Sequence, residues 1–319
     1  MFASRRVSPV VRSELERLFE LRIHDAESPP PRDDLLAHVA GVHGLVTMLT
    51  DRIDTAVFDA AGRDLRVIAH HAVGYDTVDV EEATRRGIVL TNTPDVLTET
   101  TAEFTLALLL ALTRRVTEGD RFLRSGGDWS WAPTFMLGRG LSGLSLGLVG
   151  LGSIGRAVAR LAEPLGMQVA YTNRSGAKDV EIEWLPLDAL LASCDVVSLH
   201  CPLTAETHHL IGRDELRAMR SGGLLVNTAR GALVDEAALV EALLAGEIAG
   251  AALDVFEREP AVARGLLELE NVVVAPHLGS ATHETREAMG MLCVEALKAV
   301  LLENRRPQNV VNPEVWRRG

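Results

Sequence analysis

The sequence predicts an α/β fold, in which a Rossmann-type, doubly wound parallel sheet is inserted into a second, smaller α/β domain. From Arg66 onward, short apolar runs alternate with amphipathic helical stretches, as in a parallel sheet covered by helices. A glycine-rich segment, GLVGLGSIG at 147–155, joins one apolar run to a helix-forming stretch. The residues before it contain strand–helix units of their own, so the domain that holds this segment lies inside the other one.

The glycine-rich segment predicts a dinucleotide site. Gly150 allows a tight turn, Gly152 lets a pyrophosphate approach the backbone, and Gly155 lets the helix pack closely on the strand. The N–H groups at the start of that helix then point at phosphate. A glycine-rich surface loop is the alternative, but the apolar run 146–149 and the helix-forming run 156–162 supply the context that a dinucleotide site requires.

The residues after the next strand, expected at 168–172, indicate which dinucleotide is bound. An acidic residue there would bind the ribose 2′-hydroxyl of NAD, but this chain has Asn173, Arg174 and Ser175, with Lys178 nearby. An amide, a guanidinium and a hydroxyl suit a 2′-phosphate better than a carboxylate does. We therefore expect NADP(H) to be preferred, with NAD(H) possible; in the alternative, Arg174 lies in a solvated loop.

The remaining elements follow the same alternation. Strands are expected at 44–48, 66–69, 195–199, 223–227, 250–254 and 271–275, and a helix at 236–244 that ends at Gly246. Two long helices, at about 101–116 and 282–302, are expected to connect the domains. We therefore divide the chain into a substrate domain, 1–98 with 286–319, and a dinucleotide-binding domain, 99–285. The run 1–4 leaves little room for a first strand.

Composition restricts the classes of partner. The chain has 319 residues, 47% of them hydrophobic, and a formal net charge of −12, which argues against nucleic acid or an anionic membrane surface as a partner. The apolar helix at 104–112 is too short to span a bilayer, and the N-terminal residues lack the apolar core of a signal peptide. The three cysteines show no metal or disulfide spacing, so we expect a cytoplasmic protein.

Three polar residues directly follow predicted strands, where ligands of open parallel sheets bind. Arg230 lies in NTARG, Glu259 in DVFEREP and His277 in APHLGSAT. A ketone that accepts a hydride needs a proton, which a histidine can supply near neutral pH. A carboxylate on the other ring nitrogen would orient that histidine, and the arginine would bind a substrate carboxylate. We expect Arg230, Glu259 and His277 to be the catalytic residues.

Six motifs in order carry a resemblance to a known family: VGYDTVD at 73–79, TNTPDVLTETTAE at 91–103, GLVGLGSIG, NTARGALVDEAAL at 227–239, AALDVFEREP at 251–260 and APHLGSATHETR at 275–286. The chain resembles the D-isomer-specific 2-hydroxyacid dehydrogenases over essentially its whole length. Within them it is similar to the glyoxylate/hydroxypyruvate reductase group, which includes 2-ketogluconate reductases. The resemblance implies a flavodoxin-like outer domain, a homodimer, and NADPH-linked reduction of a small 2-keto acid, such as glyoxylate or hydroxypyruvate, to a D-2-hydroxy acid.

The resemblance also implies roles for individual residues. Arg230 would bind the substrate, Glu259 would orient the histidine and His277 would donate the proton. Other positions would contact the substrate through Val73, Gly74 and Ser280, and the cofactor through Ser153, Ile154, Cys201, Pro202, Thr228 and Asp254. An aromatic residue of the loop that holds Trp129 and Trp131 would reach toward the partner subunit's site, although both could be core residues.

Several alternatives stay open. Glu257 could replace Glu259 as the acid, but the family pattern places the acid immediately before Pro260, so Glu257 is expected to be solvated. The pairs His70–His71 and His208–His209 suggest a metal, but neighbouring residues of a strand point to opposite faces and no acidic partner is evident, so no metal is expected.

Other functions on the same fold are also considered. A phosphoglycerate dehydrogenase often carries an added C-terminal domain, and this sequence ends at Gly319, whereas a formate-type enzyme places an amide where Glu259 stands. A dinucleotide-sensing, corepressor-like binding protein is a rival from another class, which the three polar residues do not exclude by themselves.

Overall fold

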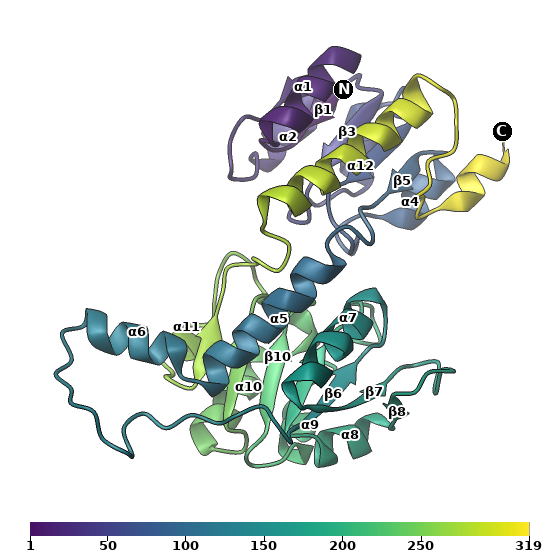
Figure 1. The fold of residues 1–319 in the computed structure, drawn as a ribbon. Coiled ribbons are helices and arrows are strands. Elements are labelled where there is room, and N and C mark those ends of the chain that lie inside the picture. The colour runs from purple at the N-terminus through teal and green to yellow at the C-terminus, as the bar shows by residue number, and fades with distance from the viewer. Residues whose placement is uncertain (319) are drawn as a thin grey trace. The chain divides into compact units, whose positions relative to one another are not determined.

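The computed structural model describes residues 1–318 and contains two compact units (Figure 1). The outer unit consists of 1–97 and 281–319, and the inner unit of 98–280. The sequence placed the return to the outer domain at 286, inside the helix α12 (His283–Leu301). The structure places it earlier because α12 packs along its length on the strands and first helix of the outer unit.

The inner unit is a seven-stranded sheet in which every neighbouring pair is parallel, in the order β12-β11-β10-β9-β6-β7-β8. The chain order reverses on the two sides of β6, which makes the carboxyl end of β6 the switch point where such sheets bind ligands. Its elements are α5 (Thr98–Thr113), α6 (Val116–Arg124), β6 (Ser145–Val149), α7 (Ser153–Ala162), η1 (Glu163–Leu165), β7 (Gln168–Thr172), β8 (Glu183–Trp184), α8 (Leu187–Ser193), β9 (Val196–Leu199), α9 (Arg213–Ala218), β10 (Leu224–Asn227), η2 (Gly231–Leu233), α10 (Glu236–Ala245), β11 (Gly250–Leu253), α11 (Arg264–Leu267) and β12 (Val272–Val274).

The expected strands of this sheet are confirmed, with β7 over the residues that the sequence assigned to it and the others shifted by about a residue at their ends. Helix α5 begins and ends about three residues earlier than expected. Arg115, with φ 55°, adopts the left-handed conformation, which stops the helix and starts α6 in a new direction. Beyond α6, the segment 125–140 is largely exposed and extends away from the sheet of its own unit (Figure 1).

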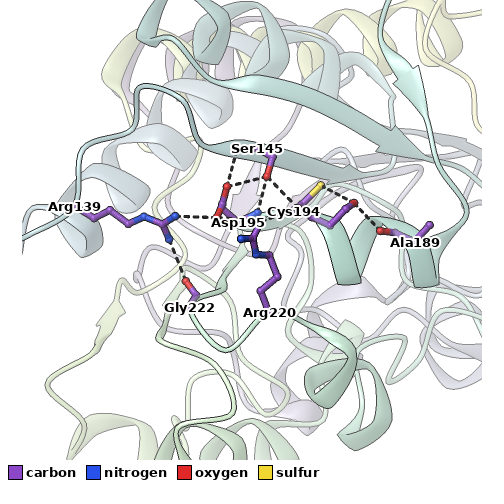
Figure 2. Close-up of polar contacts among 8 residues, drawn as sticks. Arg139, Ser145, Ala189, Cys194, Asp195, Arg220 and Gly222 are labelled. Atoms are coloured by element: carbon purple, nitrogen blue, oxygen red, sulfur yellow. Dashed lines mark hydrogen bonds and ion pairs between the residues drawn. The ribbon is translucent and has the colours of Figure 1, made fainter.

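The amino edge of the inner sheet is held by a buried carboxylate (Figure 2). Asp195, 8% exposed, accepts hydrogen bonds from the backbone N–H and the hydroxyl of Ser145 at 3.0 and 2.9 Å and from Arg139 at 2.8 Å. Arg139 also donates to the carbonyl of Gly222 just before β10. Burial acts to raise the pKa of Asp195, but these donors lower it to about 2. The network therefore joins the starts of β6, β9 and β10.

The outer unit is a five-stranded parallel sheet with the order β2-β1-β3-β4-β5, which is the flavodoxin-like order. Its first strand has two residues, yet it lies between β2 and β3. Its elements are β1 (Phe2–Ala3), α1 (Pro9–Leu18), β2 (Arg22–Ile23), α2 (Arg32–Val39), β3 (Gly44–Thr47), α3 (Thr55–Ala61), β4 (Val67–His70), α4 (Val80–Arg85), β5 (Val89–Thr91), α12 and η3 (Pro313–Arg318). Among residues 1–318, no helix combines the length and apolarity needed to cross a membrane.

His71, just after β4, is a buried histidine whose protonation should destabilise the folded chain. It is 8% exposed, and its ring nitrogens lie 3.3 Å from the sulfur of Met48 and 3.3 Å from the carbonyl oxygen of Arg286. Burial, followed by the charge of Arg286, lowers its pKa from 6.5 to about 4. The unfolded chain therefore binds this proton more readily than the folded chain between pH 6.5 and pH 4.

We expect this group's contribution to the free energy of unfolding to be complete above about pH 6.5 and to fall by about 3 kcal/mol as the pH drops to 4. Urea denaturation of the wild type and of H71Q at pH 7, 6, 5 and 4.5 measures the difference between their pH slopes. The variant H43Q, at an exposed histidine of the same unit, is the matched control and should keep the wild-type slope. Equal slopes for H71Q and wild type would show that His71 does not titrate in this way.

Candidate active site

The three residues that the sequence singled out follow three neighbouring strands of the inner sheet. Arg230 follows β10, Glu259 follows β11 and His277 follows β12, and these strands are adjacent and parallel. Their carboxyl ends therefore share one edge of the sheet. Backbone hydrogen bonds link the loops that leave this edge, from Asp254 N–H to Asn227 and from His277 N–H to the carbonyl of Asp254.

The structure brings His277 and Glu259 together. The Nδ1 atom of His277 lies 2.9 Å from Oε2 of Glu259, and both side chains are 23% exposed. Glu259 also accepts the backbone N–H of Phe256 through Oε1 at 3.1 Å, which fixes the plane of its carboxyl group. An ionised carboxylate only accepts hydrogen bonds, so Nδ1 carries a proton and Nε2 is the ring atom left to exchange one.

Electrostatics keep Glu259 ionised. Burial acts to raise the pKa of its carboxyl group. The hydrogen bond and charge of His277, the N–H of Phe256 and the positive charge of Arg230 together outweigh burial and hold the pKa below its ordinary value. The carboxylate can therefore hold the Nδ1–H of His277 in a charge-assisted hydrogen bond.

Arg230 is held by hydrogen bonds to the residues just before it in its loop. Its carbonyl oxygen accepts a hydrogen bond from the side chain of Asn227 at 2.8 Å, and its own Nη1 donates to the carbonyl of Ala229 at 2.8 Å. The side chain is half-buried, and its charge acts on Glu259. A guanidinium so placed can bind a carboxylate on the same side of the sheet as the histidine.

Asp254 performs a task that the sequence did not reveal. Its carboxylate is 1% exposed and accepts the backbone N–H groups of Leu278 and Gly279 at 2.7 and 2.8 Å. Burial raises the pKa of Asp254, although these two N–H groups and His277 act in the opposite direction. The carboxylate thus holds the turn in which His277 adopts a left-handed conformation, with φ 56°. The resemblance implied only a contact with the cofactor.

Gly231 is a second residue whose importance the sequence did not show. A Cβ atom at this position would lie 1.9 Å from the carbonyl carbon of Phe256 and 2.4 Å from the nitrogen of Glu257. The Arg230 loop therefore rests directly on the backbone of the segment that ends in Glu259. The only signal in the sequence is the glycine after the arginine in NTARG.

The glycine-rich turn has the geometry of a phosphate cradle. Gly150 has φ 104°, and a Cβ there would lie 2.8 Å from the carbonyl group of His200, at the end of β9. At Gly155 a Cβ would lie 2.2 Å from the carbonyl oxygen of Gly150, so the helix packs tightly on the turn. Gly152 is exposed with open space around it, and no side chain caps the N-terminus of α7. The first N–H groups of α7 can therefore bind an anion.

The end of β7 adds polar groups to this turn. Asn173 accepts the backbone N–H of Leu151 through Oδ1 at 3.0 Å, and its buried Nδ2 has no partner within the described structure. Lys178 donates from Nζ to the carbonyl oxygen of Leu151 at 3.0 Å. Arg174 and Ser175 are exposed beside them. The pKa of Glu206 is lowered mainly by a hydrogen bond from Thr204, and the charge of Arg174 lowers it further.

The other predicted cofactor positions are distributed along the same edge of the inner sheet. Ser153 and Ile154 form the first turn of α7, and Cys201 with Pro202 follows β9, where the nitrogen of Cys201 lies beside Gly150. The hydroxyl of Thr228 lies 2.8 Å from the hydroxyl of Thr105 on α5. Ser280, which was predicted to contact the substrate and not the cofactor, lies three residues after His277.

Val73 and Gly74 belong to the outer unit, in the loop after β4. Both are half-buried, and the carbonyl of Val73 accepts a hydrogen bond from the side chain of Asn92 at 2.9 Å.

The expectations about Glu257 and the histidine pair 208–209 were wrong. The pair lies in a turn, with the two rings 4.0 Å apart, because His209 has a left-handed backbone with φ 53°. Glu257 is half-buried, and its Oε1 lies 2.6 Å from Nε2 of His209. Two imidazoles and a carboxylate therefore gather where the strand pattern predicted divergence and no acidic partner.

The aromatic residues after α6 are exposed. Trp129 is 55% and Trp131 80% exposed, so the alternative that they are core residues of this chain is wrong. Trp129 stacks on Phe135 with ring centroids 6.3 Å apart.

Known proteins share this architecture. Residues 106–279 match the family described as D-isomer specific 2-hydroxyacid dehydrogenase, NAD binding domain. The chain is 49% identical to a glyoxylate reductase from Korarchaeum cryptofilum, over 99% of this chain and 96% of the relative.

Solved structures agree with these matches. A glyoxylate reductase from Paecilomyes thermophila is 32% identical with a TM-score of 0.87, over 98% of both chains. An NADPH-dependent glyoxylate/hydroxypyruvate reductase from Sinorhizobium meliloti, in complex with NADP and malonate, is 36% identical with a TM-score of 0.85, over 97% of this chain and 95% of that one. With the two parallel sheets and the glycine-rich turn described above, these matches show that the chain belongs to the D-isomer specific 2-hydroxyacid dehydrogenases and is an NAD(P)-dependent dehydrogenase.

Proposed function

We propose that this enzyme reduces small 2-keto acids, with glyoxylate and hydroxypyruvate as its substrates and NADPH as its preferred reductant. The observation that carries the proposal is the contact between His277 and Glu259, next to Arg230, at the carboxyl edge of the inner sheet. The relatives named as glyoxylate reductases, at 46% to 49% identity, support the substrate class.

Arg230, His277 and Glu259 each have a separate role in the proposed reaction. The guanidinium of Arg230 binds the keto-acid carboxylate and polarises the adjacent carbonyl group. When bound, the nicotinamide supplies the hydride that reduces this carbonyl carbon. His277 donates the proton from Nε2 to the resulting alkoxide, while its Nδ1–H remains hydrogen-bonded to Oε2 of Glu259. Glu259 fixes the orientation of the ring through its hydrogen bond with Nδ1.

The residues around the glycine-rich turn fit a dinucleotide that carries a 2′-phosphate. The uncapped N-terminus of α7 and the open space at Gly152 suit the pyrophosphate. The unpartnered Nδ2 of Asn173 is a buried donor, which an oxygen of the adenosine ribose would satisfy. Lys178 and Arg174 place positive charge beside it, and no carboxylate occupies the end of β7 to repel a phosphate.

Steady-state assays of glyoxylate, hydroxypyruvate, 2-ketogluconate and pyruvate with NADPH and with NADH test the proposal. We expect the highest kcat/KM for glyoxylate or hydroxypyruvate with NADPH. A clear preference for 2-ketogluconate would move the enzyme to another branch of the family. Tight NADPH binding without oxidation by any keto acid would instead support a dinucleotide-sensing protein.

The coenzyme preference should depend on the end of β7. In the double variant N173D/R174A, the carboxylate keeps the acceptor for Leu151 N–H but repels a 2′-phosphate, and the guanidinium is lost. We expect the ratio of kcat/KM for NADPH to that for NADH to fall about 10- to 100-fold. The matched control is R160A, whose exposed guanidinium pairs with Glu99 on α5. An unchanged ratio in the double variant would show that the phosphate is bound elsewhere.

The active form is proposed to be a homodimer. The segment after α6 exposes large apolar side chains, among them Trp131 at 80% and Leu137 at 63%. Exposed aromatic side chains of this size favour burial in an interface, here with a second copy of the chain. Sedimentation equilibrium of the wild type and of W131A measures this: the wild type should have the mass of two chains, and a monomeric wild type would contradict the proposal.

A further inference from the structure

The turn at 208–209 and the segment that follows β11 form a cluster outside the proposed catalytic residues. Nitrogen atoms of His208 and His209 and a carboxylate oxygen of Glu257 all lie within 4.8 Å of one another. We propose that this cluster binds a divalent transition metal ion such as Zn²⁺, through two imidazoles and one carboxylate. The inference does not depend on the proposed keto-acid reduction, since none of the three residues takes part in it.

The backbone of the turn holds both imidazoles on one side. The left-handed conformation of His209 sets the two rings 4.0 Å apart with an angle of 31° between their planes. The N–H of His209 donates to the carbonyl oxygen of Ala232 at 2.8 Å, which anchors the turn on the loop that follows Arg230. The two ring nitrogens are therefore brought together by the fold before any ion arrives, which lowers the entropic cost of binding.

The carboxylate is also fixed in position. Oε2 of Glu257 accepts the backbone N–H of Glu236, the first residue of α10, at 3.3 Å. The N–H of Glu257 in turn donates to Oε1 of Glu236 at 2.7 Å. These two bonds leave Oε1 of Glu257 directed at Nε2 of His209, 2.6 Å away.

Ligand chemistry selects the kind of ion. Imidazole nitrogens suit Zn²⁺, Ni²⁺ and Cu²⁺, and a set of two histidines and one carboxylate leaves a fourth position of a tetrahedral zinc for water. Ligand atoms around such a zinc lie roughly 3.3 Å apart, so the contact between His209 and Glu257 needs to open by only a fraction of an ångström. The carboxylate of Glu236 next to the ligand Glu257 adds further negative charge. His208 is exposed, which leaves the ion an open entry path.

An ion bound here would connect three loops of the inner unit: the turn 208–209, the loop after Arg230 and the segment that ends in Glu259. The backbone bond from His209 to Ala232 already links the first two. A metal ion on Glu257 would add the third, two residues before the carboxylate that contacts His277. The ion would thus stabilise the loops without entering the proposed catalytic site.

The test uses full-length protein without a histidine tag, stripped with a chelator and titrated with Zn²⁺ against a chromophoric competitor. We expect one ion per chain in the wild type, and at least tenfold weaker binding in E257Q, which keeps the shape of the side chain, and in H209N, because asparagine tolerates the left-handed backbone. The matched control is H43N, at an exposed histidine of the outer unit, and it should bind as the wild type does.

A second measurement, with Co²⁺, needs only the wild-type protein. Co²⁺ added to the stripped wild type should give the visible absorption of a four-coordinate ion, and a molar excess of Zn²⁺ should remove it. Zinc should also raise the midpoint of thermal unfolding of the wild type more than that of E257Q. The proposal is overturned if the wild type binds Zn²⁺ no more tightly than E257Q and H209N, or if H43N loses as much affinity as they do.

Discussion

Replacing His277 with asparagine should lower kcat for keto-acid reduction by about 10²- to 10⁴-fold. Asparagine tolerates the left-handed backbone at this position, where φ is 56°, so the turn held by Asp254 can keep its shape. The amide does not exchange a proton near neutral pH, so the reaction loses its proton donor and the partner of Glu259. Stopped-flow and steady-state measurements with glyoxylate and NADPH determine the loss.

The control for this experiment is coenzyme binding by the same variant. The dissociation constant for NADPH, measured by fluorescence, should change little, because the glycine-rich turn lies at β6, and three strands separate β6 from β12 in the sheet. A variant that keeps most of its kcat would remove His277 from the proposed role. A variant that loses NADPH affinity in the same proportion would instead indicate a disturbed fold.

Replacing Gly231 with alanine should damage activity and stability together. The new Cβ would lie 1.9 Å from a backbone atom of Phe256, and neither backbone can yield without moving the segment that carries Glu259. We expect kcat/KM to fall by at least about 10²-fold, since a shift of about 1 Å in catalytic geometry has an effect of that size. The free energy of unfolding should fall by roughly 3 kcal/mol, the upper range for overpacking.

The matched control is G140A, because a Cβ at Gly140 meets open space and its backbone needs no left-handed conformation. Urea denaturation and steady-state kinetics of both variants provide the comparison. A G231A enzyme with the stability and kcat/KM of the wild type would show that the segments 230–231 and 256–259 do not pack as described.

Much of the fold could be predicted because the strands of the inner sheet are buried on both faces. Strand β10 is an apolar run that ends at Asn227, and β9 is a run interrupted only by Ser198, so the short apolar runs themselves locate these strands. The short strands β1 and β2 were not predicted, since two residues show no periodicity; β1 is defined by its pairing with β2 and β3, and β2 by its pairing with β1. The early end of α5 depends on the left-handed Arg115, which helix propensity does not encode.

The candidate site divides in a similar way. Arg230, Glu259 and His277 could be singled out because each follows a strand, and parallel strands bring their ends to one edge. The backbone contacts of Asp254 could not be predicted, since they depend on the exact path of the turn after β12. The cluster of His208, His209 and Glu257 was missed for the same reason: a single positive φ brings together two rings that an extended chain would separate.

The buried carboxylate at Asp195 has a consequence for how such an enzyme can change over evolutionary time. Alignment of the central strands depends on Ser145, Arg139 and the chain around Gly222, none of which lies in a loop that leaves the opposite edge. Mutations in those loops can therefore alter which acid is accepted while the scaffold stays in place. The residues that align the amino edge of the sheet are therefore separate from the loops at the edge where the acid would bind.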